Sequence, residues 1–294
     1  MHLFSLAKAA AISLGTTALL LVGACAVRPE APIIEQLAGP AASDTAARID
    51  ALMPTDVLLL GEQHDAAEHQ QIEQRVIANL AQRGVLAAVA LEMADAGTST
   101  AKLHPSSSDE QARFALKWSD KSWPWAAYGP AVMTAVRAGV PVLGANLPRA
   151  QMRGGMADSK LDGQLPGPAL KAQQQLIRIG HCNLLPESQI TPMTRIQIAK
   201  DISMANTLSQ ASVPGKVVLL ISGYGHADRF LGVPQHLGAD LKAKVIRLSA
   251  GGAATGDAGV ASDMVWVTPA LPETDYCAGL RQQLGPKAAE DIKP

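Results

Sequence analysis

Aromatic residues and cysteines are both scarce in this chain of 294 residues, which contains 3% aromatics and three cysteines. An excess of charge of either sign is also lacking, since 25 Lys and Arg stand against 26 Asp and Glu, with no basic run. This balance gives no indication of a nucleic-acid surface. The motifs H-E-x-x-H and G-x-S-x-G and the phosphate-binding loop are absent, so neither a zincin nor an ordinary serine esterase is favoured.

Apolar residues are plentiful, at 48% of the sequence, which is enough for a sizeable core. The N-terminus has the features of a secretory signal. Lys8 gives a basic start, and residues 9–22 form an apolar run too short for a comfortable membrane span. The sequence V-G-A-C at 22–25 resembles the lipobox of bacterial prolipoproteins, which predicts removal of residues 1–24 and lipid on Cys25. An ordinary signal peptide or an uncut anchor is the alternative.

The segment after the signal predicts an exported, lipid-tethered protein. Ala26, rather than Asp, favours the outer membrane as the destination, and residues 25–50 are rich in Pro, Ala and Gly, as suits a linker. In an oxidising compartment Cys182 and Cys277 most simply form one disulfide. The competing interpretation is a thiolate metal ligand at Cys182, beside His181.

Short apolar runs alternate with helical patterns along the rest of the chain. This alternation predicts one α/β domain at 51–283, with a mostly parallel sheet flanked by helices, and a tail at 284–294. A helical insertion is expected at about 105–138, interrupted by Pro124, Gly129 and Pro130, and a loop at 150–168. The predicted strands are 56–61, 85–91, 140–145, 216–222, 243–248 and an edge strand at 264–268; the predicted helices are 66–83, 169–180, 192–211 and 232–240.

The stretch 56–70 carries the densest set of polar groups. A buried-type strand ends there and is followed at once by Glu62 and His64. Asp65 and Glu68 have the spacing of a helix N-cap and its partner three residues on, so a helix should begin here. His69 lies on the apolar stripe of that helix and is expected to face the core.

Polar side chains recur just past the C-terminal ends of the predicted strands. In a parallel sheet these ends share one edge, so the side chains should converge on one site. The helix at 192–211 adds Gln197 and Asp201, in line with the apolar Met204 and Leu208, as in a helix that lines a pocket at one end. The strand-end residues are Glu62 and His64, then Glu92, then Asn146 and Arg149, and finally His226 within G-Y-G-H at 223–226.

Three of the four tryptophans lie within residues 114–128, with one Phe and one Tyr. We interpret Trp118 as a core residue. Trp123, Trp125 and Tyr128, around a proline, are more typical of a lid, a partner surface or an apolar platform for a flat ligand.

Two functions fit these residues. Haem needs an axial His, Tyr or Met, an apolar slot and cations for its propionates. A metal-dependent hydrolase would hold zinc or manganese and use a carboxylate as general base. The haem candidates are Tyr128, Tyr224, His64, His226 and Arg149; the hydrolase candidates are Glu62, His64, His226 and His181 for the metal, with Glu92 or Asp201 as base.

Seven motifs, in this order, are similar to those of the ChaN-like haem-binding lipoproteins, in the wider Tiki/TraB/erythromycin-esterase-like superfamily. The resemblance implies an α/β domain in an iron-linked surface lipoprotein. For ChaN itself it implies two haems stacked face to face between two subunits, with tyrosine ligation. The motifs span about residues 50–280 and read L-L-L-G-E-Q-H-D-A-A-E-H-Q, A-L-E-M, W-P-W-A-A-Y-G-P, G-A-N-L-P-R, G-H-C-N-L-L-P, Q-I-A-K-D-I-S-M-A and S-G-Y-G-H-A-D-R-F-L-G-V-P.

The resemblance also implies roles for single residues. Tyr128, in W-x-W-x-x-Y, becomes the leading haem-ligand candidate, whereas Tyr224 stands where G-N-G-H is expected. The sequence around Cys277 fits the family and strengthens its pairing with Cys182. Paired G-x-x-H motifs, used at a metal site by peptidases of the superfamily, are both present and keep the hydrolase as the alternative.

The sequence therefore predicts a lipid-anchored protein that binds haem or iron during iron acquisition, in a homodimer completed by a second subunit. The haem is expected to lie against Trp123, Trp125 and Tyr128, with Arg149 and Tyr224 as further cofactor-binding residues.

Overall fold

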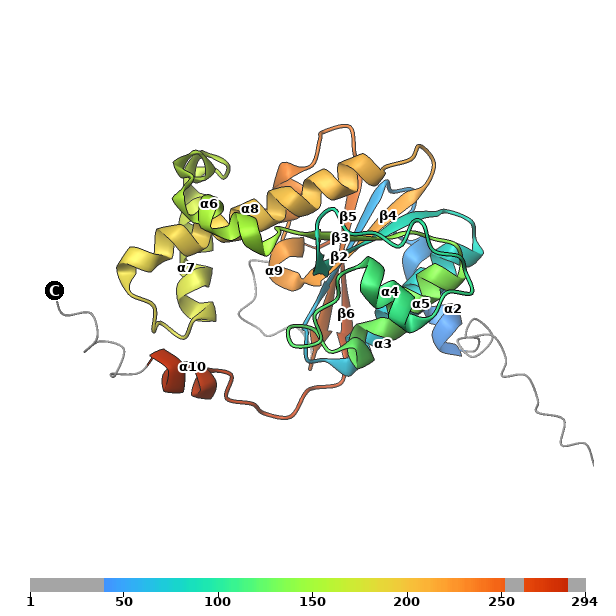
Figure 1. Cartoon of the computed structure of the whole chain (residues 1–294), viewed down its shortest axis with the longest axis horizontal. Coiled ribbons are helices and arrows are strands. Elements are labelled where there is room, and N and C mark those ends of the chain that lie inside the picture. The colour runs from blue at the N-terminus through green and yellow to red at the C-terminus, as the bar shows by residue number, and fades with distance from the viewer. Residues whose placement is uncertain (1–39, 252–261, 285–294) are drawn as a thin grey trace, which may run out of the picture.

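A six-stranded parallel sheet is the centre of the computed structural model, which describes residues 40–251 and 262–284 (Figure 1). The strand order is β3-β2-β4-β1-β5-β6, and every neighbouring pair is parallel, which confirms the predicted α/β fold. The predicted signal peptide, Cys25 and most of the tail lie outside the described residues. The strands are β1 (Val57–Glu62), β2 (Leu86–Asp95), β3 (Val142–Asn146), β4 (Val217–Gly223), β5 (Ala243–Ala250) and β6 (Met264–Thr268).

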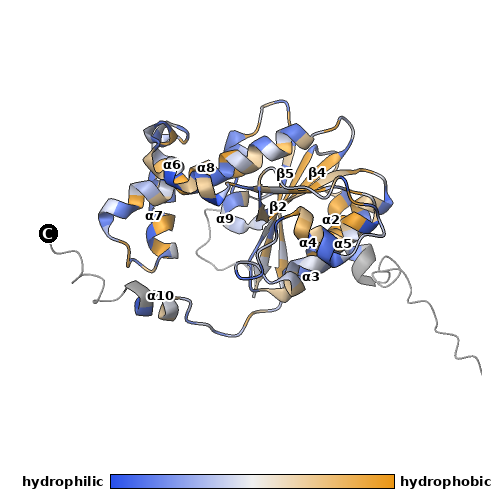
Figure 2. Cartoon of the chain, in the orientation of Figure 1, coloured by the Kyte–Doolittle hydropathy of each residue, from blue (hydrophilic) through white to orange (hydrophobic). Residues whose placement is uncertain are grey.

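Helices cover both faces of the sheet because successive strand residues point to opposite sides. Leu58 and Leu60 of β1 pack in the larger core, under α2, α3, α4 and α5, while Val57 and Leu59 pack under α8 and α9. Figure 2 shows the strands as the most apolar part of the molecule. The helices are α2 (Pro40–Asp50), α3 (Ala67–Gln82), α4 (Asp109–Ala115), α5 (Trp125–Arg137), α6 (Met152–Ala157), α7 (Gly167–Gly180), α8 (Glu187–Ala211), α9 (Tyr224–Ala227) and α10 (Cys277–Leu284), with 3-10 turns η1 (Arg149–Gln151), η2 (Ser159–Gly163) and η3 (Val233–His236).

Helix α3 follows its predicted apolar stripe and ends at Gly84, whose φ of 68° is one that glycine adopts without steric cost. The predicted cap was wrong. Ala66 occupies the N-cap position without a side-chain hydrogen bond, and Asp65 instead accepts a hydrogen bond from Tyr276 in the C-terminal part of the chain.

Three segments are more helical than the sequence predicted. Pro130 lies inside α5 without ending it, because Ala131, Val132 and Met133 just beyond it are buried against the core. Helix α5 lies in the crossover between β2 and β3 and packs against α3; the expected interruption at Pro124, its N-cap residue, is confirmed, whereas those at Gly129 and Pro130 are wrong. The expected loop at 150–168 contains α6 and two 3-10 turns, and residues 40–50 of the expected linker form α2, which packs on α3.

A small lobe extends from one end of the sheet. It consists of α6, η2, α7 and the first half of α8, around an apolar cluster of Leu161, Leu165 and Ile198 (Figure 1). Cys182, just after α7, is joined to Cys277 by a disulfide with a Cα–Cα distance of 5.9 Å, as predicted, so the thiolate-ligand interpretation of Cys182 is wrong. Within residues 40–251 and 262–284, no helix is long and apolar enough to span a bilayer.

Candidate functional site

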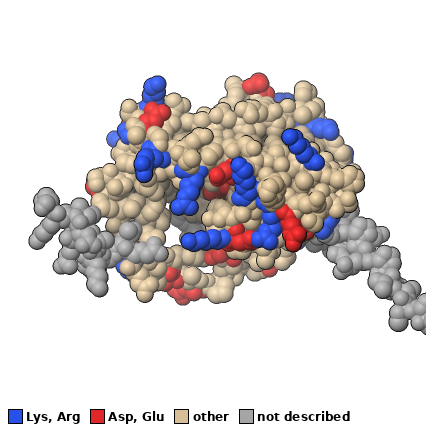
Figure 3. Space-filling model, viewed as in Figure 1, with Lys and Arg blue, Asp and Glu red and all other residues tan. Residues whose placement is uncertain are grey.

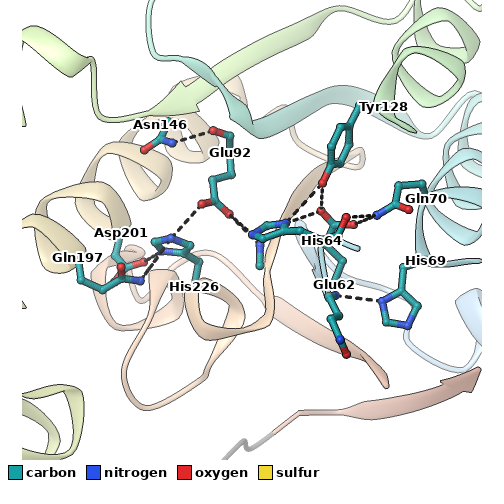
Figure 4. A network of polar contacts seen from close by, with 12 residues as sticks. Glu62, His64, His69, Gln70, Glu92, Tyr128, Asn146, Gln197, Asp201 and His226 are labelled. Atoms are coloured by element: carbon teal, nitrogen blue, oxygen red, sulfur yellow. Dashed lines mark hydrogen bonds and ion pairs between the residues drawn. The ribbon is translucent and has the colours of Figure 1, made fainter. Parts of the chain in front are cut away.

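Six side chains from five parts of the fold form a continuous set of polar contacts at the C-terminal edge of the sheet (Figure 4). They meet there because β4 lies between β1 and β2 in a parallel sheet, so that the three strand ends are adjacent. We call this set the polar cluster: Glu62 at the end of β1, His64 just after it, Glu92 in β2, Tyr128 in α5, Asp201 in α8 and His226 in α9.

Glu62 is fully buried and receives hydrogen bonds from three directions. The Tyr128 hydroxyl donates to Glu62 Oε1 at 2.8 Å, and His64 Nδ1 lies 2.8 Å from the same oxygen. The side-chain amide of Gln70, on α3, donates to Oε2. A buried carboxylate is costly unless its oxygens are satisfied in this way, so the three donors fix the position of Glu62.

Glu92 lies between the two histidines of the cluster. Its Oε2 accepts a hydrogen bond from the backbone N–H of Gly223 at 2.8 Å, and its Oε1 lies 3.3 Å from His226 Nε2. His64 Nε2 is 3.9 Å from Oε2. Burial alone would raise the pKa of Glu92, but the positive charge and hydrogen bond of His226 outweigh it and hold this pKa well below its usual range.

His226 is a buried cation held by two carboxylates. Its Nδ1 lies 2.5 Å from Asp201 Oδ1, on the other side from Glu92. Burial opposes the charge, yet Glu92 and Asp201 together raise the pKa of His226 to about 10. For Asp201 burial prevails over the attraction of His226 and raises the pKa to about 6. Both ring nitrogens of His226 are thus paired with carboxylates.

His64 is the member of the cluster through which a ligand can reach it. Its side chain is 40% exposed, whereas those of Glu62, Glu92, Asp201 and His226 are at most 7% exposed. The Trp123 ring lies edge-on to the imidazole, with the centroids 4.9 Å apart. The pKa of His64 is raised despite burial, because Glu62 accepts its hydrogen bond and Glu92 lies nearby.

Glu73 is a buried acid beside the cluster that the sequence analysis did not predict. It lies on α3, fully buried, and no donor from the described residues reaches either of its carboxylate oxygens. Burial and the adjacent negative charge of Glu62 hold the pKa of Glu73 well above its usual range. A signal was present, because Glu73 follows His69 by one helical turn on the stripe that faces the core.

The other predicted residues are more scattered. His69 is buried as expected, and its ring contacts the backbone N–H of Gln63 and the hydroxyl of Thr268 rather than the cluster. His181 donates to or accepts from no member of the cluster; its Nδ1 contacts the carbonyl of Ile177, beside the disulfide. Asn146 donates to the backbone carbonyl of Glu92, which supports the cluster from β3.

The aromatic residues fall into two groups. Trp118 packs against the core, as predicted, and Trp125 packs on it at the surface, with its indole N–H donating to Asp109. Trp123 and Tyr128 pack against each other beside His64.

Tyrosines 128 and 224 differ in access. Tyr128 is 2% exposed and its hydroxyl is bound to Glu62, whereas Tyr224, the first residue of α9, is 46% exposed beneath the Arg247 guanidinium. Burial and the charge of Glu62 raise the pKa of Tyr128, which opposes the phenolate form that a haem iron binds.

Within the described ranges, no group of three or more His, Cys, Asp or Glu side chains is arranged to hold a metal ion. The proposed hydrolase ligands Glu62, His64 and His226 do lie in one cluster, but they pair with one another and with Glu92, and His181 is elsewhere. The hydrolase alternative therefore lacks an assembled metal site in this part of the chain.

Fold and cluster together define an α/β protein with a parallel sheet, an exposed histidine and buried acids at the C-terminal edge. The chain belongs to the family described as "Haem-binding uptake, Tiki superfamily, ChaN", whose model matches residues 48–237, and this confirms the predicted resemblance.

Two solved structures are similar to this chain. The one described as "Cofacial heme binding to ChaN of Campylobacter jejuni" is 26% identical, with a TM-score of 0.59 over 71% of this chain and 86% of that chain. The structure of the type III effector HopBA1 is 16% identical, with a TM-score of 0.45 over 76% of this chain and 92% of that chain. A search of curated proteins found no match.

Proposed function

We propose that this protein binds haem at the exposed side of the polar cluster, with Nε2 of His64 as the iron ligand. The observation that carries the proposal is the pairing of His64 Nδ1 with the buried carboxylate of Glu62. Histidines that bind metals commonly donate their other ring N–H to a carboxylate, which fixes the tautomer and makes the free nitrogen a better ligand. Bound iron would supply the haem's redox and ligand-binding chemistry.

The surroundings of His64 suit a flat, partly apolar ligand that carries carboxylates. The ring of Trp123 lies beside His64, and Tyr224, which follows Gly223 in the chain, is an exposed aromatic residue in a chain with few aromatics. Arg149, exposed at the end of β3, and Arg247, over Tyr224, are candidates for the propionates. Lys and Arg side chains gather in the middle of the face shown in Figure 3, interspersed with Asp and Glu.

The chain's own residues would hold and orient the haem. His64 is kept in place by Glu62, and Glu62 in turn by Tyr128 and Gln70. Tyr128 thus positions the ligand rather than binding iron itself, which revises the role expected from the sequence. The family's haem-binding character, and the cofacial haems described for the Campylobacter jejuni protein, support haem as the ligand.

Haem titration of the purified protein, followed by the Soret band through gel filtration, tests the proposal. We expect His64→Ala to weaken binding roughly tenfold or more and to shift the Soret maximum, since one axial ligand is worth at least about 1.4 kcal/mol. His104→Ala, which removes an exposed histidine on a distant loop, is the matched control. Tyr128→Phe and Tyr224→Phe should keep the wild-type maximum. If the Soret maximum is unchanged in His64→Ala but shifted in Tyr224→Phe, the iron ligand is Tyr224 rather than His64.

We also propose that the protein is lipid-anchored at Cys25, exported to the outer membrane and active in iron acquisition as a homodimer. The lipobox-like sequence at 22–25 supports the anchor. Cys25→Ser should move the protein from the membrane to the soluble fraction of its host, and membrane association that survives this change would contradict the anchor. Light scattering with and without haem tests the homodimer.

A further inference from the structure

The C-terminal segment, residues 269–284, runs from the end of β6 towards α7 and away from the sheet (Figure 1). It lies beyond residues 48–237, the range that the family model matches. Most of its residues are exposed. Within the described part of the chain, only Tyr276 forms hydrogen bonds from this segment to other parts of the molecule; the remaining ones join residues of the segment to one another. Two adjacent residues, Tyr276 and Cys277, connect it to the rest of the molecule.

Tyr276 is anchored on both sides of His64. Its hydroxyl donates to Asp65 Oδ2 at 2.6 Å and lies 3.3 Å from the side-chain nitrogen of Gln63. Gln63 and Asp65 are the residues immediately before and after His64, so the hydroxyl is held against the loop that carries His64. The residue is 59% exposed, although its hydroxyl is fully engaged.

Cys277 fixes the same point covalently. Its disulfide with Cys182 ties the segment to the end of α7, across 95 residues of sequence. Two exposed hydrogen bonds alone are too weak to offset the conformational entropy lost when a segment of this length is ordered. The disulfide therefore keeps Tyr276 where it is.

We infer that Tyr276 is a ligand-binding residue, whose ring packs against a flat porphyrin bound at the neighbouring His64 and is held in reach of it by the Cys182–Cys277 disulfide. An aromatic ring with one polar tip is suited to this role, because the hydroxyl is bound by Asp65 while the ring surface is left to the ligand. The inference rests on the proposed function and adds a binding residue outside the matched range.

Metal-free protoporphyrin IX separates the ring contact from iron ligation, since it presents the same flat surface but has no iron for His64. Its affinity, measured by quenching of tryptophan fluorescence, should fall roughly tenfold in Tyr276→Ala and stay within about threefold of wild type in Tyr276→Phe, which keeps the ring. Phe114→Ala removes another highly exposed ring, on α4, and is the matched control.

The double variant Cys182→Ser/Cys277→Ser tests the disulfide without leaving a free thiol that could bind iron. We expect it to lose porphyrin affinity as Tyr276→Ala does, with an unchanged far-ultraviolet circular dichroism spectrum. Unaltered porphyrin affinity in Tyr276→Ala would overturn the inference, and unaltered affinity in the double variant would overturn the role of the disulfide. If His64→Ala binds haem as tightly as wild type while Tyr276→Ala still weakens porphyrin binding, only the assignment of His64 as the iron ligand is refuted.

Discussion

The pKa values of two buried histidines, near the ends of β1 and β4, are shifted in opposite directions. His226 lies between Glu92 and Asp201, and its pKa is raised to about 10. His69 is enclosed without such a partner close by: it accepts a hydrogen bond from the Gln63 backbone and donates to Thr268, and burial lowers its pKa. The identity of the nearest partner, rather than burial itself, decides whether each ring is charged.

The charge of His226 predicts a pH dependence of stability. Because its folded-state pKa is about 10 against an ordinary 6.5, its stabilising contribution is complete below pH 6.5 and is lost as the pH rises to about 10. His226→Gln should therefore flatten the decline in unfolding free energy over this range, measured by urea denaturation at a series of pH values. His104→Gln is the control. Equal slopes in wild type and His226→Gln would contradict the prediction.

The close approach of Gly223 to His64 gives a second prediction. A Cβ at position 223 would lie 2.9 Å from His64 Nε2, whereas one at Gly225 would meet nothing within 4 Å. Gly223→Ala should displace the imidazole and weaken haem binding roughly tenfold, at a stability cost within about 1 kcal/mol. Gly225→Ala should bind haem normally. If Soret titration gives equal haem affinities for the two variants, contact between a Cβ at position 223 and His64 does not affect haem binding.

At the scale of elements, apolar runs predicted all six strands to within a few residues, because a strand buried on both faces has a continuous apolar sequence. Prolines were poorer guides to where helices begin and end. Helix α8 begins at Glu187 and continues through Pro192, the expected start, just as α5 continues through Pro130. In both helices, residues near the proline are buried by tertiary packing, which spacing along one helix cannot reveal.

The sequence predicted which residues meet at the site, but not which of them form hydrogen bonds or ion pairs with one another. Strand-end position brought together Glu62, His64, Glu92 and His226, because parallel topology alone determines that edge. Which groups pair depends on side-chain directions and on loops. The hydrogen bond that the buried Tyr128 donates to Glu62, for example, cannot be predicted from spacing along the chain.

The buried face of α3 yields a prediction about Glu73. An acid whose pKa is raised on folding is destabilising once the pH exceeds its ordinary value of 4.5, because its proton is retained only by the folded state. Glu73→Gln supplies a neutral side chain of the same size and should raise the unfolding free energy at pH 8, measured by urea denaturation. Glu68→Gln, on the exposed side of the same helix, should have no comparable effect. A lower unfolding free energy in Glu73→Gln would contradict the prediction and show that the carboxyl group of Glu73 stabilises the fold.

At the scale of the whole molecule, the disulfide links two regions that otherwise share few contacts. Closing a loop of roughly 100 residues is expected to stabilise by about 4.7 kcal/mol on the entropy model. Cys182→Ser/Cys277→Ser should cost less than this, because the C-terminal segment also gains freedom in the folded state when it is released. Guanidinium denaturation of both proteins measures the difference. A cost at or above the full entropic value would mean that the segment supports the core.

The strand order also dictates when the binding site can come into being. Strand β4 lies between β1 and β2, so the two carboxylate-bearing strands are joined into one sheet only when residues 217–223 have been made and pair with both. Such non-local pairing is slow to form and leaves strand edges open meanwhile. A nascent chain that ends just before β4 therefore carries Glu62, Glu92 and Asp201, but lacks the strand that brings them together.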